Sequence, residues 1–174
     1  MLDALYSTMF RPTSDRAFAA QLALPIGLLV IVILTLNAAG ALGVGAFGVI
    51  LLTMTFLFAG LLGWYWFSAS INLISQWLGG AGNGRSTALA IAQGLFPLIF
   101  TGPAIAAMNW SEALGAIFSL LIFVSLLVTL VIAIRRAHHF HWWKAIAALV
   151  ITLTLSAFAL FGLVLWPLML ALGT

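Results

Sequence analysis

Residues 44–77 constrain this chain most, because the whole stretch is apolar or uncharged and contains no charged side chain. As one α-helix, at about 1.5 Å per residue, it would reach roughly 50 Å, while the hydrocarbon core of a bilayer is ~30 Å thick. Such a helix must tilt, break or protrude from the membrane. The aromatic residues 64–67 and the polar residues after them favour protrusion into the headgroup region.

The composition places the whole chain in a membrane. Hydrophobic residues make up 65% of its 174 residues and charged residues only 5%, against about 45–50% and about 25% in soluble proteins. So few charges cannot solvate a globule, although they can solvate the ends of membrane helices. We therefore exclude a disordered chain and a soluble nucleic-acid-binding domain. With no cysteine, the chain also cannot form disulfides, zinc–thiolate sites or iron–sulfur clusters.

We predict an all-α fold, a polytopic membrane helix bundle with five transmembrane helices. Residues 17–174 form its membrane domain, with spans at about 17–38, 44–77, 87–108, 113–134 and 145–172. The first apolar run is too long for a cleavable signal peptide. Residues 1–16 form a cytoplasmic or interfacial segment whose apolar positions follow helical spacing. That segment is either a short interfacial helix or a frayed terminus.

Charge placement sets the predicted orientation. With the N-terminus in the cytoplasm, all six Lys and Arg residues fall on the cytoplasmic side, and Glu112 lies on the opposite side. This agrees with the positive-inside rule and places the C-terminus outside. A four-span or six-span count would divide the basic residues between the two sides. We expect an integral protein of a bacterial inner membrane or a photosynthetic membrane.

Two motifs that could carry chemistry are disfavoured. Residues 79–86 match the phosphate-loop pattern except that Arg85 replaces its lysine, but no strand precedes the loop and no magnesium-binding aspartate is available. A turn between two spans, with Arg85 as a cytoplasmic anchor, explains them better. His138, His139 and His141 lack a nearby carboxylate or cysteine and lie among basic residues, so an interfacial loop is favoured over a metal site.

No catalytic constellation emerges, and we expect no enzyme, no metal and no cofactor. Glu112 is the only acid beyond residue 15 and lies on the membrane face opposite the histidines. No span has an ionisable residue near its middle. The polar and helix-breaking features within the spans are few, so a small transporter or channel would have to depend on Gln93, Pro97 and Pro103.

Candidate contact residues lie in the fourth-to-fifth loop and the fifth span. The loop combines basic and aromatic groups suited to anionic lipid at headgroup depth. The fifth span carries small residues at helical spacing, which let another helix approach closely. The predicted partner or lipid contacts are Arg135, Arg136, Trp142, Trp143, Lys144, Ala148, Thr152 and Ser156. Similar small pairs are Ala59 and Gly63, Ala90 and Gly94, and Gly115 and Ser119.

The order of these features resembles the YIP family of Ypt/Rab-interacting membrane proteins. The resemblance rests on a juxtamembrane opening, a glycine-glycine loop after the second span, and prolines in the third span. The matching residues are Phe10-Arg11-Pro12 with Phe18, then residues 78–82 with Arg85 and Thr87, then Pro97 and Pro103. The five-span layout also agrees. Eukaryotic members have a long cytosolic region before the first span, so the resemblance implies a bacterial-type member.

The resemblance implies association with other membrane proteins and supplies no catalytic residues. We expect a non-enzymatic scaffold, adaptor or accessory subunit that acts through helix–helix association. Its partners would be membrane lipids and other membrane proteins, with a homo-oligomer possible and no nucleic acid. The alternatives are an accessory subunit of a photosynthetic or respiratory membrane complex and a small transporter or channel.

Overall fold

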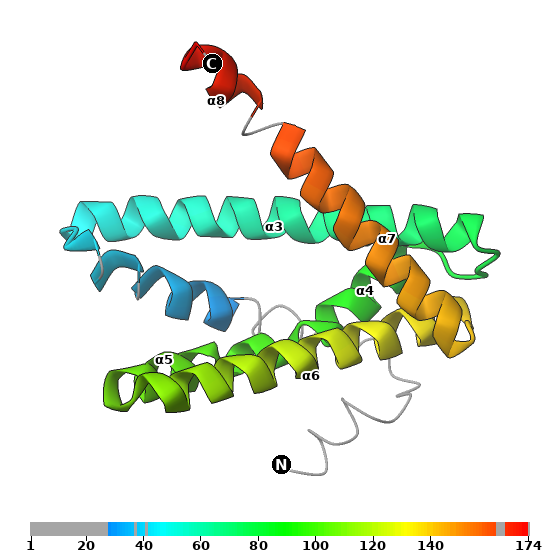
Figure 1. Ribbon diagram of the computed structural model, residues 1–174, viewed down its shortest axis with the longest axis horizontal. Helices are drawn as coiled ribbons and strands as arrows, with labels where there is room; N and C mark the ends of the chain where they lie inside the picture. The colour runs from blue at the N-terminus through cyan, green and yellow to red at the C-terminus, as the bar shows by residue number, and fades with distance from the viewer. Residues whose placement is uncertain (1–27, 37, 41, 163–165, 174) are drawn as a thin grey trace.

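The computed structural model describes residues 28–36, 38–40, 42–162 and 166–173, and the described part is helical throughout apart from turns and short connections (Figure 1). A shorter apolar helix, Leu28–Gly40, comes first. The elements after it are α3 (Ala46–Trp77), α4 (Gly84–Gly94), the 3-10 helix η1 (Phe96–Phe100), α5 (Thr101–Trp110), α6 (Glu112–His138), α7 (Trp142–Leu160) and α8 (Trp166–Ala171).

The predicted all-α membrane bundle is confirmed. Four segments of the described part of the chain are long and apolar enough to cross a bilayer: Ala46–Trp77, Gly84–Trp110, Glu112–His138 and Trp142–Leu160. They correspond to the predicted second to fifth spans. The first predicted span and the possible interfacial helix lie largely or wholly outside the described residues.

Helix α3 is one unbroken helix of 32 residues. Its buried residues, Ser68, Ile71, Ile74 and Ser75, all lie near its C-terminal end. The preceding residues 46–67 include no buried residue. Helix α3 therefore enters the bundle core only with its last third.

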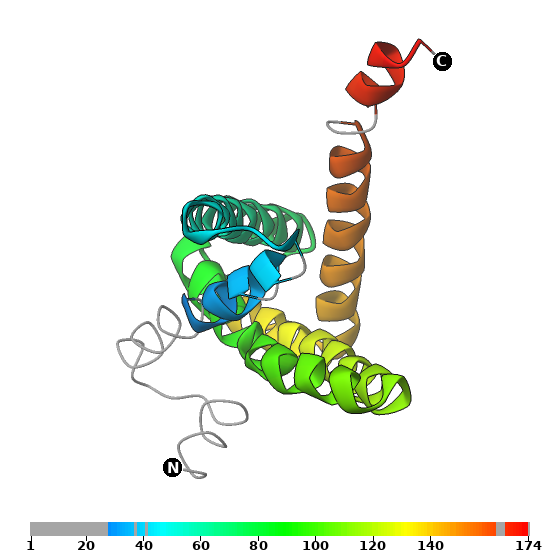
Figure 2. The ribbon, with the colours of Figure 1, turned by 90° about the vertical axis from the view of Figure 1, so that its left-hand side faces the viewer.

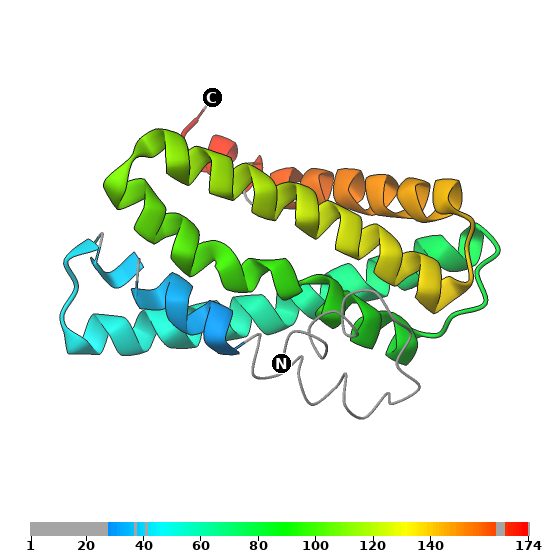
Figure 3. The same cartoon turned by 90° about the horizontal axis from the view of Figure 1, so that it is seen from below.

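The third span is interrupted rather than merely bent. Helix α4 ends at Gly94, η1 follows with Pro97 in its first turn, and α5 begins at Thr101. Proline has no backbone N–H and clashes with the preceding turn, so a 3-10 turn replaces the regular helix here. After Trp110 the chain reverses at Ser111 into α6, which runs back along α5 and α4 (Figure 3).

The apolar core lies where α3, α4, α6 and α7 meet. Its buried members include Ile71, Ile91, Ile134, Phe140 and Leu149. Helix α7 contacts α3 and α6, and its own buried residues lie between Ala145 and Thr152. Beyond them α7 leads away from the other helices, as Figure 2 shows. The predicted fifth span ran to residue 172, whereas α7 ends at Leu160 and a separate α8 begins at Trp166.

Candidate functional site at the loop end of the bundle

Two connections far apart in sequence meet at one end of the bundle, called here the loop end. They are the glycine-rich loop, residues 78–83, between α3 and α4, and the turn, residues 139–141, between α6 and α7. The amide of Ala81 donates to the carbonyl of His138 at 3.4 Å. The ammonium of Lys144 donates to the carbonyl of Leu78 at 2.9 Å. The glycine-rich loop is therefore hydrogen-bonded to the end of α6 and the start of α7, on either side of the turn.

A buried hydrogen bond links α4 to α6 at the loop end. The Nε2 atom of His138 lies 2.9 Å from the hydroxyl of Thr87, and both side chains are almost completely buried. The same hydroxyl lies 2.8 Å from the carbonyl of Asn83, to which it donates. A threonine hydroxyl has one proton, so when Thr87 donates it to Asn83, Thr87 can only accept from His138. The tautomer of His138 with its proton on Nε2 fits this arrangement.

The second ring nitrogen of His138 faces the glycine-rich loop. Nδ1 is buried and has no hydrogen-bond partner among the described residues. A Cβ added at Gly80 would lie 2.9 Å from this atom, and one at Gly82 would lie 2.6 Å from it. Phe140 stacks on the ring with centroids 5.6 Å apart. Only glycine lets the loop backbone approach the imidazole this closely.

The start of α4 is fixed by its own residues. The Asn83 side chain accepts from the amide of Ser86 at 2.8 Å, and the amide of Asn83 donates to the Ser86 hydroxyl at 3.1 Å. This reciprocal pair is a capping box. The amides of Gly80 and Ala81 donate to Ser75 and His138. Because these two amides already have partners, they are not free to hold a phosphate.

The predicted basic and aromatic contact residues gather at the loop end. The guanidinium of Arg135 lies 4.6 Å from the centre of the Trp142 ring. The ammonium of Lys144 lies 5.9 Å from the centre of the Phe140 ring. Both cations are exposed, as are Arg136, Trp142 and Trp143. The loop end therefore presents cations held against aromatic rings.

The predicted small-residue stripe of α7 lies mostly inside the chain. Ala148 and Thr152 are fully buried, and the Thr152 hydroxyl donates to the Ala148 carbonyl at 2.7 Å. Ser156, one turn on, is half-buried. Since α7 contacts α3 and α6, these residues serve packing between helices of this chain. We do not propose Ala148 or Thr152 as contacts for another protein.

The three loop histidines do not converge. His138 is buried, while His139 and His141 are exposed. His139 adopts a left-handed conformation, φ 55°, at the end of α6, and His141 precedes α7 as its N-cap. Within the described residues, no group of three His, Cys, Asp or Glu side chains could hold a metal ion.

Comparison with known proteins identifies the family. The Yip1 domain matches residues 6–165, nearly the whole chain. The chain belongs to the Yip1 family. No curated protein and no solved structure matches it. The family predicted from the glycine-glycine loop and the two prolines is confirmed, and so is an integral membrane protein with several apolar helices.

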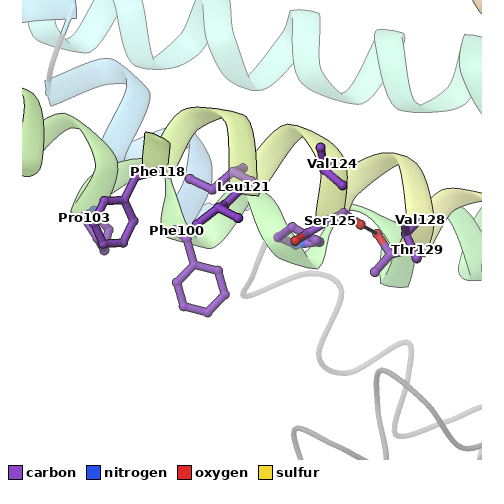
Figure 4. Close-up of a pocket in the computed structure, with 10 residues that line it drawn as sticks. Phe100, Pro103, Phe118, Leu121, Val124, Ser125, Val128 and Thr129 are labelled. Carbon is purple, nitrogen blue, oxygen red and sulfur yellow. Dashed lines mark hydrogen bonds between the residues drawn. The ribbon is translucent and has the colours of Figure 1, made fainter. Parts of the chain in front are cut away.

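This Yip1-family chain also has an apolar pocket, away from the loop end. It encloses about 390 Å³ against η1, α5 and α6 (Figure 4). Pro97 and Pro103 line it on one side, with Phe118, Ser125 and Thr129 on the other. The Thr129 hydroxyl lies 2.7 Å from the carbonyl of Gly94 and 2.9 Å from that of Ser125. The pocket therefore suits an apolar group.

Sequence reasoning missed the pairing of Thr87 with His138. The two residues are 51 positions apart, and neither lies in a pattern that predicts contact. In the sequence, Thr87 stands out only as part of the family resemblance, and His138 only as one of three loop histidines. One signal was present in the Yip1 glycine-rich loop itself, because Gly80 and Gly82 allow close backbone approach.

Proposed function

We propose that this Yip1-family chain is a non-enzymatic membrane scaffold or adaptor that associates laterally with another membrane-spanning helix. The observation that carries the proposal is the exposed part of α3, residues 46–67, which contains no buried residue. At about 1.5 Å per residue this part is roughly 33 Å long, close to the ~30 Å hydrocarbon core. In the most apolar 18-residue stretch of α3, 0% of the residues are buried inside the chain, against 17–28% in the corresponding stretches of the other three spans.

In this part of α3, Ile50, Leu62 and Trp66 are each more than half exposed. Between them around the helix, six further large exposed side chains follow one face, called here the α3 stripe. They recur at alternating spacings of four and three residues, and each is between 53% and 73% exposed. This is the spacing of helices that pack along their length by inserting side chains between those of a partner. The α3 stripe consists of Phe47, Leu51, Met54, Phe58, Leu61 and Tyr65.

The α3 stripe points away from the bundle. At 3.6 residues per turn, it lies roughly 120° around α3 from the residues that contact the rest of the chain. On that inner side, Trp64 donates its indole N–H to the carbonyl of Ala88 at 3.2 Å. A Cβ at Gly60, also on the inner side, would lie 3.6 Å from Ile31. An incoming helix could therefore pack on the α3 stripe without displacing any of the helices that the structure describes.

Photo-cross-linking in native membranes tests the proposal. A photoreactive residue at Phe58 should yield a discrete protein adduct, either with a second copy or with another membrane protein. The matched control is Phe123 on α6, which is also an exposed phenylalanine. Adducts with lipid alone at position 58, or the same protein adduct from both positions, would contradict a specific helix contact.

The identity of the adduct separates the two scaffold alternatives. Two differently tagged copies that cross-link through Phe58 indicate self-association. Subunits of a photosynthetic or respiratory complex would instead indicate an accessory subunit. Phe58→Ala should reduce the co-purification found for the wild type while leaving thermal stability unchanged, because the Phe58 side chain is 70% exposed.

A small transporter or channel is the second candidate function. The specific observation in its favour is the interrupted third span, where η1 borders the apolar pocket. Interrupted helices line substrate sites in many transporters. The apolar lining favours a lipid-like substrate over an ion. Reconstitution into vesicles, with release of a fluorescent lipid or a small ion as the readout, separates this candidate from a scaffold.

A further inference from the structure

The loop end lies at headgroup depth if α6 crosses the membrane. From Glu112 to Arg135 the helix advances 23 residues, roughly 35 Å at about 1.5 Å each. This distance slightly exceeds the ~30 Å hydrocarbon core. Glu112 and Arg135 therefore reach opposite headgroup layers.

Arg135 lies over an indole ring and keeps its donors available. Its guanidinium lies 4.6 Å from the centre of the Trp142 ring, and a cation above an indole face is attracted by the ring. No carboxylate pairs with Arg135 in the part of the chain that the structure describes. A guanidinium above a ring keeps N–H groups that can reach two phosphate oxygens.

Lys144 supplies a second cation at the same end. Its ammonium donates to the Leu78 carbonyl at 2.9 Å, which uses one of its three N–H groups. The remaining donors are free to contact an anion, because the side chain is exposed. Trp143 follows Trp142 and is 75% exposed, which suits the interfacial layer where tryptophan is enriched.

We propose that the loop end binds the phosphate headgroup of an anionic membrane lipid, with Arg135 and Lys144 as the cations and Trp142 as the ring that orients Arg135. The charge distribution supports this ligand, since the one acid in the described ranges, Glu112, lies at the far end of α6. The depth of the site and its exposed indoles favour a lipid over a soluble anion. This inference goes beyond helix association, which depends on the α3 stripe.

Native mass spectrometry of the full-length chain in mild detergent tests the inference. Phosphatidylglycerol and phosphatidylcholine of identical acyl chains are offered together. The wild type should retain phosphatidylglycerol preferentially. Arg135→Gln and Lys144→Gln should each weaken that retention about five-fold, since a basic residue near an anionic surface contributes about 1 kcal/mol. Arg135→Lys keeps the charge but loses the guanidinium fork, and should restore only part of the affinity.

Arg85→Gln is the matched control, because Arg85 is an exposed cation in the first turn of α4, at the same end of the bundle. It should change retention less than two-fold. Equal losses from Arg85→Gln and Arg135→Gln would overturn the defined site in favour of diffuse charge attraction. Equal retention of the two lipids would overturn lipid selectivity. Displacement of phosphatidylglycerol by millimolar inorganic phosphate would assign the site to a soluble anion instead. Phe58→Ala should leave all of these results unchanged.

Discussion

The close approach of the glycine-rich loop to the end of α6 predicts that Gly82→Ala destabilises the protein. An alanine Cβ at this position would lie 2.5 Å from the carbonyl oxygen of Ala137 and 2.6 Å from Nδ1 of His138. One obstacle is backbone and the other is a buried ring that is hydrogen-bonded to Thr87. Neither is the free end of a flexible side chain, so the loop itself must move.

The expected magnitude follows from those contacts. Inserting a methyl group into a packed site costs about 1–3 kcal/mol. A chain of this length loses about 2–4 °C of melting temperature per kcal/mol, so Gly82→Ala should melt several degrees below the wild type. Moving the loop would also stretch the bond from the Ala81 amide to the His138 carbonyl, which is already 3.4 Å long.

Thermal stability of the full-length chain in one detergent, followed by the loss of monodisperse protein, measures this difference. Gly84→Ala is the matched control, because a Cβ there would meet only the Asn72 side chain, at 3.9 Å. Alanine is also the better helix former by about 1 kcal/mol, so this variant should match or exceed the wild type. In a His138→Ala background, the Gly82→Ala penalty should shrink but persist, because the Ala137 carbonyl remains. If Gly82→Ala melts with the wild type, the close packing of the loop on α6 is refuted.

Three further predictions concern other parts of the fold. Thr87→Val should lower the free energy of unfolding, measured in a denaturation series, by about 1–3 kcal/mol, because it leaves Nε2 of the buried His138 without its partner. The control Thr55→Val removes an exposed hydroxyl of α3 and should lower it by less than about 0.5 kcal/mol. Equal losses from the two variants would argue against the buried hydrogen bond. Thr152→Leu should lower the melting temperature by several degrees through overpacking of a fully buried site, while Ile151→Leu, on a residue 41% exposed, should change little. Single cysteines at Arg85 and His141 should resist an impermeant thiol reagent outside intact cells, whereas one at Ser111 should react; labelling at Arg85 would reverse the predicted orientation.

The long helices could be predicted from sequence because their signal is local. Residues 44–77 contain no charge, and an uncharged apolar run of that length is typical of a membrane-spanning helix. Pro97 and Pro103 predict kinks in the third span, because proline has no backbone N–H. The structure has a 3-10 helix at Pro97, whereas Pro103 lies in the first turn of an unbroken α5. The predicted fifth span, 145–172, covers most of α7, Trp142–Leu160, and all of α8, Trp166–Ala171, because the sequence is apolar throughout.

The loop end could be predicted only in part, because it is built from tertiary contacts. We interpreted residues 79–86 as a turn and the three histidines as one interfacial loop. The structure instead packs Gly80 and Gly82 onto a buried His138, leaving His139 and His141 exposed. The separation between Thr87 and His138 carries no periodic signal. The small residues of α7 could not be interpreted fully for a similar reason. Small residues allow a second helix to approach closely, but they do not show whether that helix belongs to the same chain.

The concentration of buried residues at the loop end has a mechanical consequence. Helices α3 and α7 and the α5–α6 hairpin share their packing and hydrogen bonds at that end, and they diverge from it (Figures 1 and 2). Away from that end, the helix Leu28–Gly40 lies between α3 and α5, where a Cβ at Gly60 would meet Ile31 and one at Gly102 would meet Ile33. If the loop end lies in one leaflet, lateral pressure in the other leaflet acts on the parts of the helices outside the core. We expect a change in lipid composition there to alter the angles between α3, α7 and the α5–α6 hairpin while the core at the loop end stays intact.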